Sequence, residues 1–161
     1  MILKKIIIAL DSDNFEYTIN VVKNLKKEAF AFKIGYEFFL NFGLDGYKII
    51  QKENIRIFLD LKLHDIPNTV KKGILAISKL NPYFTTIHLS GGDEMQKAAI
   101  TSKQKTKILG VSVLTSLNSE QTQKFYFNQD IKSIVSNFAK YALDNGLDGI
   151  VCSPKEIKTI K

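Results

Sequence analysis

The sequence predicts an α/β protein with a (β/α)8 barrel fold, of which these 161 residues cover about the first six βα units. Short apolar runs recur along the chain, and amphipathic segments lie between several of them. Runs that are apolar at nearly every position are typical of parallel strands buried on both faces. Polar residues gather where the runs end, as they do at the mouth of a barrel.

The six apolar runs are rich in β-branched and aromatic residues and are bounded by turn-forming or polar residues. Such runs favour strands over helices because they are too short for a buried helix. No linker or low-complexity tract divides the chain, so we expect one domain over residues 1–161. The predicted strands are Ile6–Leu10, Ala31–Ile34, Ile55–Leu61, Phe84–Leu89, Lys107–Val113 and Gly149–Cys152.

Three segments between the strands have apolar residues at helical spacing with lysines on the opposite face. They are Asn14–Lys27, Asn68–Leu80 and Ile131–Leu143. Residues that commonly begin helices follow three of the predicted strands. These helix starts are Ser12-Asp13-Asn14, Ser90-Gly91-Gly92 and Ser116–Ser119.

Repeated βα units of this kind have two solutions, an open doubly wound sheet and a closed barrel. An open sheet concentrates its functional residues near one switch point, whereas a barrel collects them around one mouth. No G-x-G-x-x-G motif follows the first strand. The barrel is favoured because polar residues end most strands: Asp11, Lys33, Asp60, Lys62, His88, Thr115, Ser116 and Ser153.

Composition narrows the function classes. The chain is 45% hydrophobic and 24% charged, which is typical of a globular protein, and its net charge is +7. That charge indicates either a solvated surface or a field that attracts an anionic ligand. Nucleic acid is disfavoured as a partner because Arg56 is the only arginine.

The first apolar run is too short for a signal or membrane segment, so we expect a cytoplasmic protein without a membrane partner. Cys152 lies in an apolar run and is interpreted as a buried thiol.

The most informative segment is the end of the third predicted strand. Asp60 and Lys62 are two residues apart, so in a regular strand they point to the same face. A buried charge costs several kcal/mol, in order of magnitude, unless it is paired, and these two residues can pair. Asp65 follows in a short loop, and Pro67 suits the first turn of a helix. A structural ion pair beside a polar loop is the alternative interpretation, and His64 is interpreted as structural.

The run Asp60-Leu61-Lys62-Leu63-His64-Asp65-Ile66-Pro67-Asn68-Thr69 resembles the signature of the orotidine 5'-phosphate decarboxylase family, bacterial type. The resemblance continues in order along essentially the whole chain. The further matching segments are Ile8-Ala9-Leu10-Asp11, Phe32-Lys33-Ile34-Gly35, Phe42-Gly43, Ile87-His88-Leu89-Ser90-Gly91-Gly92, Val111-Ser112-Val113-Leu114-Thr115-Ser116 and Asp148-Gly149-Ile150-Val151-Cys152-Ser153.

The resemblance implies a homodimer that converts orotidine 5'-monophosphate to uridine 5'-monophosphate and CO2 in de novo pyrimidine biosynthesis, without cofactor or metal. The active sites would lie at the subunit interface. One subunit would supply Lys33, Asp60 and Lys62, with Lys62 as proton donor. Its neighbour would supply Asp65 and Thr69. The remaining implied substrate-binding residues are Asp11, which with Lys33 would bind the ribose, and Ile66 beside Asp65. Thr115, or Ser116 beside it, would lie near the pyrimidine, and Thr115 is the better match.

The chain departs from the family's pattern at its end. Lys161 falls within what resembles the helix after the sixth strand, whereas the family's phosphate-binding residues follow its seventh and eighth strands. We therefore expect that the chain is a portion of a longer protein. Two other functions stay open. One is a Mg²⁺-dependent sugar-phosphate decarboxylase or synthase of the same superfamily. The other is a non-enzymatic, basic module that binds anions or nucleic acid. This second function does not explain why Asp60 and Asp65 flank Lys62.

Overall fold

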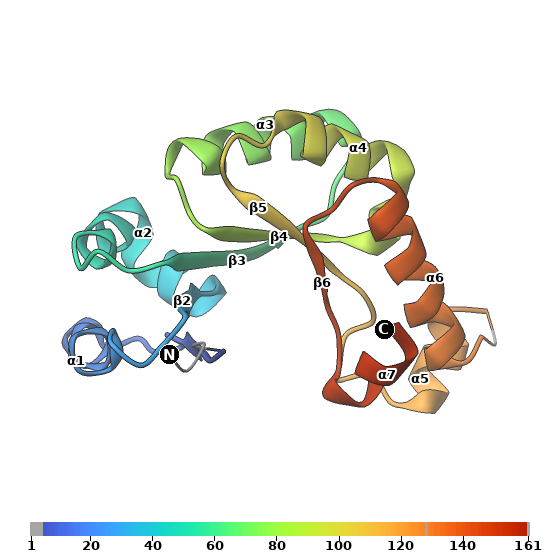
Figure 1. The fold of residues 1–161 in the computed structure, drawn as a ribbon, viewed down its shortest axis with the longest axis horizontal. Coiled ribbons are helices and arrows are strands. Elements are labelled where there is room, and N and C mark those ends of the chain that lie inside the picture. The colour runs from blue at the N-terminus through green and yellow to red at the C-terminus, as the bar shows by residue number, and fades with distance from the viewer. Residues whose placement is uncertain (1–4, 128, 161) are drawn as a thin grey trace. The chain divides into compact units, whose positions relative to one another are not determined.

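The computed structural model describes residues 5–127 and 129–160. Within them strands and helices alternate along the chain (Figure 1), and each predicted strand is present within two residues of its predicted bounds. In chain order the elements are β1 (Ile7–Ala9), α1 (Phe15–Leu25), β2 (Ala31–Ile34), α2 (Tyr36–Gln51), β3 (Ile57–Leu63), α3 (Pro67–Lys79), β4 (Phe84–His88), η1 (Leu89–Gly91), α4 (Asp93–Ser102), β5 (Lys107–Val111), α5 (Ser119–Phe125), α6 (Ile131–Asp144), β6 (Gly149–Val151), η2 (Pro154–Glu156) and α7 (Ile157–Ile160).

The strands are neighbours in their chain order, β1-β2-β3-β4-β5-β6. The pairs β1–β2, β2–β3 and β5–β6 are parallel. An unbroken sequential order is the topology of successive barrel units, whereas a doubly wound sheet reverses at a switch point. The order therefore supports the barrel over the open sheet. Strand β2 is buried at most of its positions, as the sequence predicted for a strand covered on both faces. Strand β1 is partly exposed because it stands at one end of the order.

The chain forms two compact units. The N-terminal unit consists of the chain up to Leu61 together with Asn81–Thr85. The C-terminal unit consists of Lys62–Leu80 together with the chain from Thr86 onward. The sequence predicted a single domain over residues 1–161, and that assignment stays a prediction.

The core of the N-terminal unit lies between its strands and helices α1 and α2. Its largest fully buried side chains include Phe32, Phe38 and Tyr47, and burial raises the pKa of the Tyr47 phenol well above its usual value. Helix α2 is interrupted at Gly43, whose φ of 56° is accessible to glycine without strain. Arg56 lies over the ring of Phe30, with its guanidinium carbon 4.6 Å from the ring centroid, so its charge stabilises this packing.

The C-terminal unit has two apolar clusters. The first joins α3, α4 and their strands through Val70, Ile74, Ile87, Met95, Ala99 and Ile108. The second packs Val113 against Ile134 and Val135 of α6. The turn before α4 explains the glycine pair seen in the sequence. Gly92 has a φ of 82°, and a Cβ on Gly91 would lie 2.2 Å from the Met95 sulfur. A tight turn thus accounts for both glycines.

Local capping signals explain where several helices begin. Asn14 caps α1 by accepting a hydrogen bond from the Tyr17 backbone N–H at 2.9 Å. Asn118, inside the predicted helix start Ser116–Ser119, forms a reciprocal capping box with Gln121. Pro67 occupies the first turn of α3, as predicted. None of the described helices is long and apolar enough to span a membrane.

Neighbouring isoleucines in α2 allow a test of the N-terminal core. Ile50 is fully buried, whereas Ile49 is 43% exposed. We expect Ile50→Ala to lower the free energy of unfolding by about 2–5 kcal/mol because it leaves a cavity, and Ile49→Ala to lower it by less than about 1 kcal/mol. Chemical denaturation measures both values. Equal losses in the two variants would contradict the assigned orientation of α2.

Candidate active site

Asp60 is a buried carboxylate in the middle of β3, directly after the apolar first half of the strand. It follows Ile57, Phe58 and Leu59 in β3, and the residue is only 6% exposed. Its Oδ2 lies 3.7 Å from the Nζ of Lys33, which comes from the neighbouring strand β2. This distance is an ion pair rather than a short hydrogen bond. The Lys33 ammonium therefore compensates a charge that would otherwise be costly to bury.

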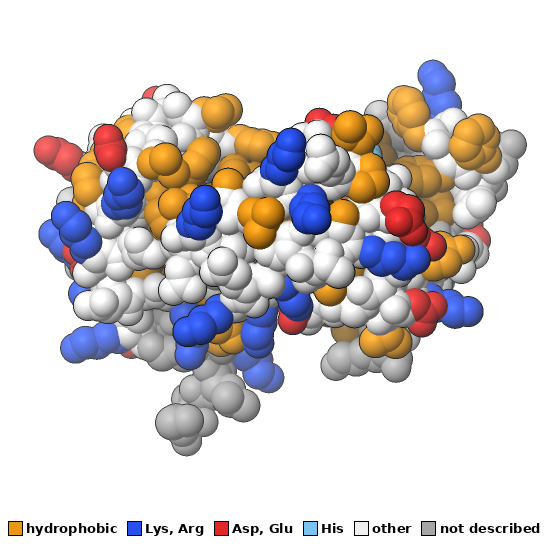
Figure 2. Space-filling model, turned by 90° about the horizontal axis from the view of Figure 1, so that it is seen from above, with side chains coloured by type: hydrophobic (Ala, Val, Ile, Leu, Met, Phe, Trp, Pro, Cys, Tyr) orange, Lys and Arg blue, Asp and Glu red, His pale blue; other side chains and the backbone are white. Residues whose placement is uncertain are grey.

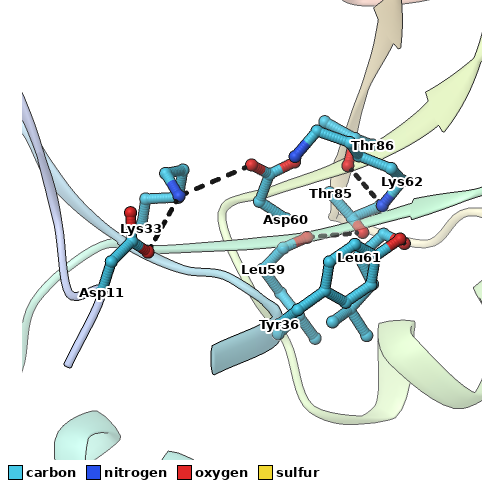
Figure 3. Close-up of polar contacts among 9 residues, drawn as sticks. All are labelled: Asp11, Lys33, Tyr36, Leu59, Asp60, Leu61, Lys62, Thr85 and Thr86. Atoms are coloured by element: carbon cyan, nitrogen blue, oxygen red, sulfur yellow. Dashed lines mark hydrogen bonds and ion pairs between the residues drawn. The ribbon is translucent and has the colours of Figure 1, made fainter. Parts of the chain in front are cut away.

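Asp11 extends this pair into a chain of alternating charges. Its Oδ1 lies 3.3 Å from the same Lys33 Nζ, while its side chain is 52% exposed. The backbone N–H of Leu10 donates to the Lys33 carbonyl at 2.9 Å, which holds the segment after β1 against β2. Figure 3 shows Lys33 between the two carboxylates. The parallel register thus brings three charged residues together: Asp11 after the end of β1, Lys33 near the end of β2 and Asp60 in the middle of β3.

Gly35 leaves the space that this charge chain needs. A Cβ built on Gly35 would lie 3.2 Å from the Asp11 Oδ1 and 3.3 Å from the Lys33 Nζ. Both distances are tighter than ordinary contacts, so a larger residue would push the two charged groups aside. The sequence indicated no role for Gly35.

Lys62 follows Asp60 by two residues and has an unusual backbone. Its φ is 44°, in the left-handed region that residues other than glycine seldom adopt. Its backbone N–H donates to the Thr86 Oγ1 at 2.9 Å, and Thr86 is fully buried. Before it in the chain, the Leu61 carbonyl accepts a 2.8 Å hydrogen bond from the Tyr36 hydroxyl. The sequence indicated neither Thr86 nor Tyr36 as a site residue.

The loop after β3 is exposed and locally ordered. The Asp65 Oδ1 accepts a hydrogen bond from the Ile66 backbone N–H at 2.6 Å, and the Thr69 N–H donates to the Ile66 carbonyl at 3.0 Å. Asp65, Ile66 and Thr69 all lie at the surface of the C-terminal unit. The loop after β3 and the first turn of α3 therefore present all three predicted residues to solvent.

Thr115 borders a cavity in the C-terminal unit, of about 540 Å³. Its lining also includes Ser153 and Lys155 from the segment after β6, and Asp130 at the start of α6. Hydrogen bonds from the Ser133 hydroxyl and backbone N–H hold the pKa of the Asp130 carboxyl below its usual value. Asp130 is therefore an anionic helix cap at the edge of this cavity at neutral pH.

The other reactive side chains considered in the sequence are two histidines, His64 and His88, and one cysteine, Cys152. The rings of His64 and His88 lie against each other, with centroids 5.1 Å apart and planes inclined by 36°. Cys152 is half-buried rather than fully buried as predicted. Its partial burial, with a smaller contribution from Glu156, raises the pKa of its thiol. A raised pKa reduces the thiolate fraction, in agreement with a non-nucleophilic cysteine. Among the described residues, no group of three or more His, Cys, Asp or Glu side chains could hold a metal ion.

Comparisons with known proteins place the chain in a family. The family model for "Orotidine 5'-phosphate decarboxylase / HUMPS family" matches residues 4–161. Proteins named orotidine 5'-phosphate decarboxylase from Wolbachia sp. subsp. Brugia malayi and from Aquifex aeolicus are 43% and 39% identical. The alignments cover 96% and 98% of this chain, and 70% of each relative.

Solved structures agree with the sequence comparison. Orotidine 5'-phosphate decarboxylase from Lactobacillus acidophilus is 37% identical, with a TM-score of 0.86 over 98% of this chain and 75% of that one. An uncharacterized conserved protein from Geobacillus kaustophilus is 28% identical, with a TM-score of 0.88 over 96% of this chain and 76% of that one. The predicted fold class, a (β/α)8 barrel represented by its first six βα units, is confirmed. The chain belongs to the orotidine 5'-phosphate decarboxylase / HUMPS family.

Proposed function

We propose that this chain supplies the catalytic lysine and its carboxylate partners to an orotidine 5'-phosphate decarboxylase. The reaction converts orotidine 5'-monophosphate to uridine 5'-monophosphate and CO2, as the family membership and the names of the relatives indicate. The observation that carries the proposed site is the chain of alternating charges, in which Lys33 bridges Asp11 and Asp60 directly before Lys62. The ligand that the family membership implies is a nucleotide.

The chemistry explains why a lysine belongs at this position. Loss of CO2 from C6 of the pyrimidine leaves a carbanion that no adjacent carbonyl can delocalise. An ammonium group held where this charge develops stabilises the transition state more than the ground state. In our proposal Lys62 supplies that charge and then transfers a proton from its Nζ to C6. The C6–carboxylate bond breaks, its electron pair stays on C6, and the Lys62 proton joins that pair.

The carboxylates have different roles in this proposal. Lys62 is kept oriented by Asp60 of its own subunit and by Asp65 of the neighbouring subunit. Asp60 also stands near the substrate carboxylate, which raises the energy of the ground state. Asp11 and Lys33 bind ribose hydroxyl groups. The exposure of Asp11 and the partial exposure of Lys33 support this role, because both groups can reach a ligand. Thr115, on the rim of its cavity, contacts the pyrimidine.

We also propose that the protein acts as a cytoplasmic homodimer with shared active sites. Asp65 and Thr69 would enter the site of the neighbouring subunit, with Ile66 beside them. The exposure of all three residues supports this part of the proposal, because side chains at the surface are available to a second chain. The hydrogen bond from the Ile66 N–H orients the Asp65 carboxylate, and the bond from the Thr69 N–H to the Ile66 carbonyl holds the backbone at the start of α3.

Replacement of Lys62 tests the proton donor. In the full protein, Lys62→Ala should lower kcat for orotidine 5'-monophosphate by at least the ~10²–10⁴-fold typical of a general acid, because electrostatic stabilisation is lost as well. Lys79→Ala, at the exposed end of α3, is the matched control and should retain full activity. A Lys62→Ala enzyme within tenfold of wild type would be incompatible with the assignment.

Mixing inactive variants tests the shared site. Lys62→Ala and Asp65→Ala chains, dissociated and reassociated in equal amounts, should regain about a quarter of wild-type activity, because half of the two-fold dimers are mixed and each mixed dimer has one intact site. Lys62→Ala mixed with Asp60→Ala is the control. Those two residues serve the same site from one chain, so every site keeps a lesion and no activity should return. Failure of the first mixture would place Asp65 in the site of its own subunit.

A further inference from the structure

The peptide bond between Leu61 and Lys62 is held by a side chain at each end. The Leu61 carbonyl accepts from the Tyr36 hydroxyl at 2.8 Å, and the Lys62 N–H donates to the Thr86 Oγ1 at 2.9 Å. Figure 3 shows the contact between Thr86 and the Lys62 backbone as a dashed line. Side-chain groups thus fix the orientation of the peptide plane that immediately precedes the Lys62 Cα.

This peptide matters because the Lys62 backbone is strained. A φ of 44° is rare for a residue with a Cβ, and such a conformation persists only where its surroundings enforce it. The direction in which the Lys62 side chain leaves the strand depends on this torsion. A group that holds the Lys62 N–H therefore acts on the position of the ammonium at the far end of the side chain.

Thr86 is suited to hold this N–H. Its side chain is fully buried, so the hydroxyl is shielded from competing water. We propose that Thr86 is a positioning residue for decarboxylation, whose hydroxyl maintains the left-handed backbone of Lys62 and thereby directs its ammonium group at the substrate. This inference rests on the proposed role of Lys62 as proton donor.

The neighbouring threonine separates this role from ordinary strand packing. Thr85 is as fully buried as Thr86, and its hydroxyl also makes a 2.9 Å hydrogen bond to the backbone. That bond goes to the Leu59 carbonyl, in the apolar part of β3, rather than to Lys62. Loss of either hydroxyl should cost comparable stability, whereas only loss of the Thr86 hydroxyl should act on the lysine.

The experiment compares Thr86→Val, Thr86→Ser and Thr85→Val in the full protein, with kcat and KM measured for orotidine 5'-monophosphate. Valine keeps the shape of threonine but lacks the hydroxyl, so it removes the hydrogen bond that Thr86 accepts from the Lys62 N–H and no longer holds the strained torsion. Because a misplacement of about 1 Å can cost about 10²-fold in rate, Thr86→Val should lower kcat by ~10- to 100-fold. Its KM should stay within about threefold of wild type, since nucleotide binding is not altered. Thr86→Ser and Thr85→Val should keep kcat within about threefold.

Three outcomes would overturn the inference: a Thr86→Val enzyme with normal kcat, a Thr85→Val enzyme that is equally slow, or a Thr86→Ser enzyme that is not rescued. Melting curves establish that each variant is folded. If Thr86→Val does not fold, Thr86→Ala takes its place against Thr86→Ser with the same expected difference in kcat. Lys62→Ala is assayed in parallel. An active Lys62→Ala enzyme would refute the proposed function itself, whereas an inactive one beside a normal Thr86→Val enzyme would refute only the role of Thr86.

Discussion

The buried carboxylate of Asp60 is the constraint on which the rest of the site depends. A carboxylate buried in a largely apolar strand is costly unless a cation lies beside it, and Lys33 provides that cation from the adjacent strand. The parallel register of β1, β2 and β3 sets the positions of both groups and of Asp11. Gly35 keeps room for them. The sheet therefore fixes an electrostatic arrangement that no single segment could hold.

In our proposal Lys62 links this arrangement to the reaction. A lysine that stabilises a developing carbanion has to be charged and aimed before the substrate binds, because reorganisation during the reaction would raise the barrier. Carboxylates account for the charge in our proposal. The left-handed torsion of Lys62 and its hydrogen bond to Thr86 account for the direction in which the lysine side chain points. Strained backbone of this kind costs about 1–3 kcal/mol, which the surrounding fold has to offset.

The sequence was most informative where structure is local. All six strands were predicted within two residues, because apolar runs bounded by polar residues have few other solutions. Helix α2 was not predicted, because its interruption at Gly43 breaks the helical spacing of its apolar residues. Asp11, Lys33 and Asp60 could be predicted because each stands at or near the end of a predicted strand. The torsion of Lys62 could not, since lysine has no preference for that region. The sequence contained one sign that Thr86 has a special role, because two adjacent threonines, Thr85 and Thr86, interrupt a predicted apolar strand.

The choice between a lysine ammonium and a metal ion as the source of positive charge separates this enzyme from a Mg²⁺-dependent sugar-phosphate enzyme of the same superfamily. The direct measurement is turnover of orotidine 5'-monophosphate by the full protein after exhaustive treatment with chelator. If Lys62 supplies the charge, kcat and KM should be unchanged in excess chelator and unaffected by added Mg²⁺. Activity that disappears with the chelator and returns with Mg²⁺ would contradict the proposed mechanism.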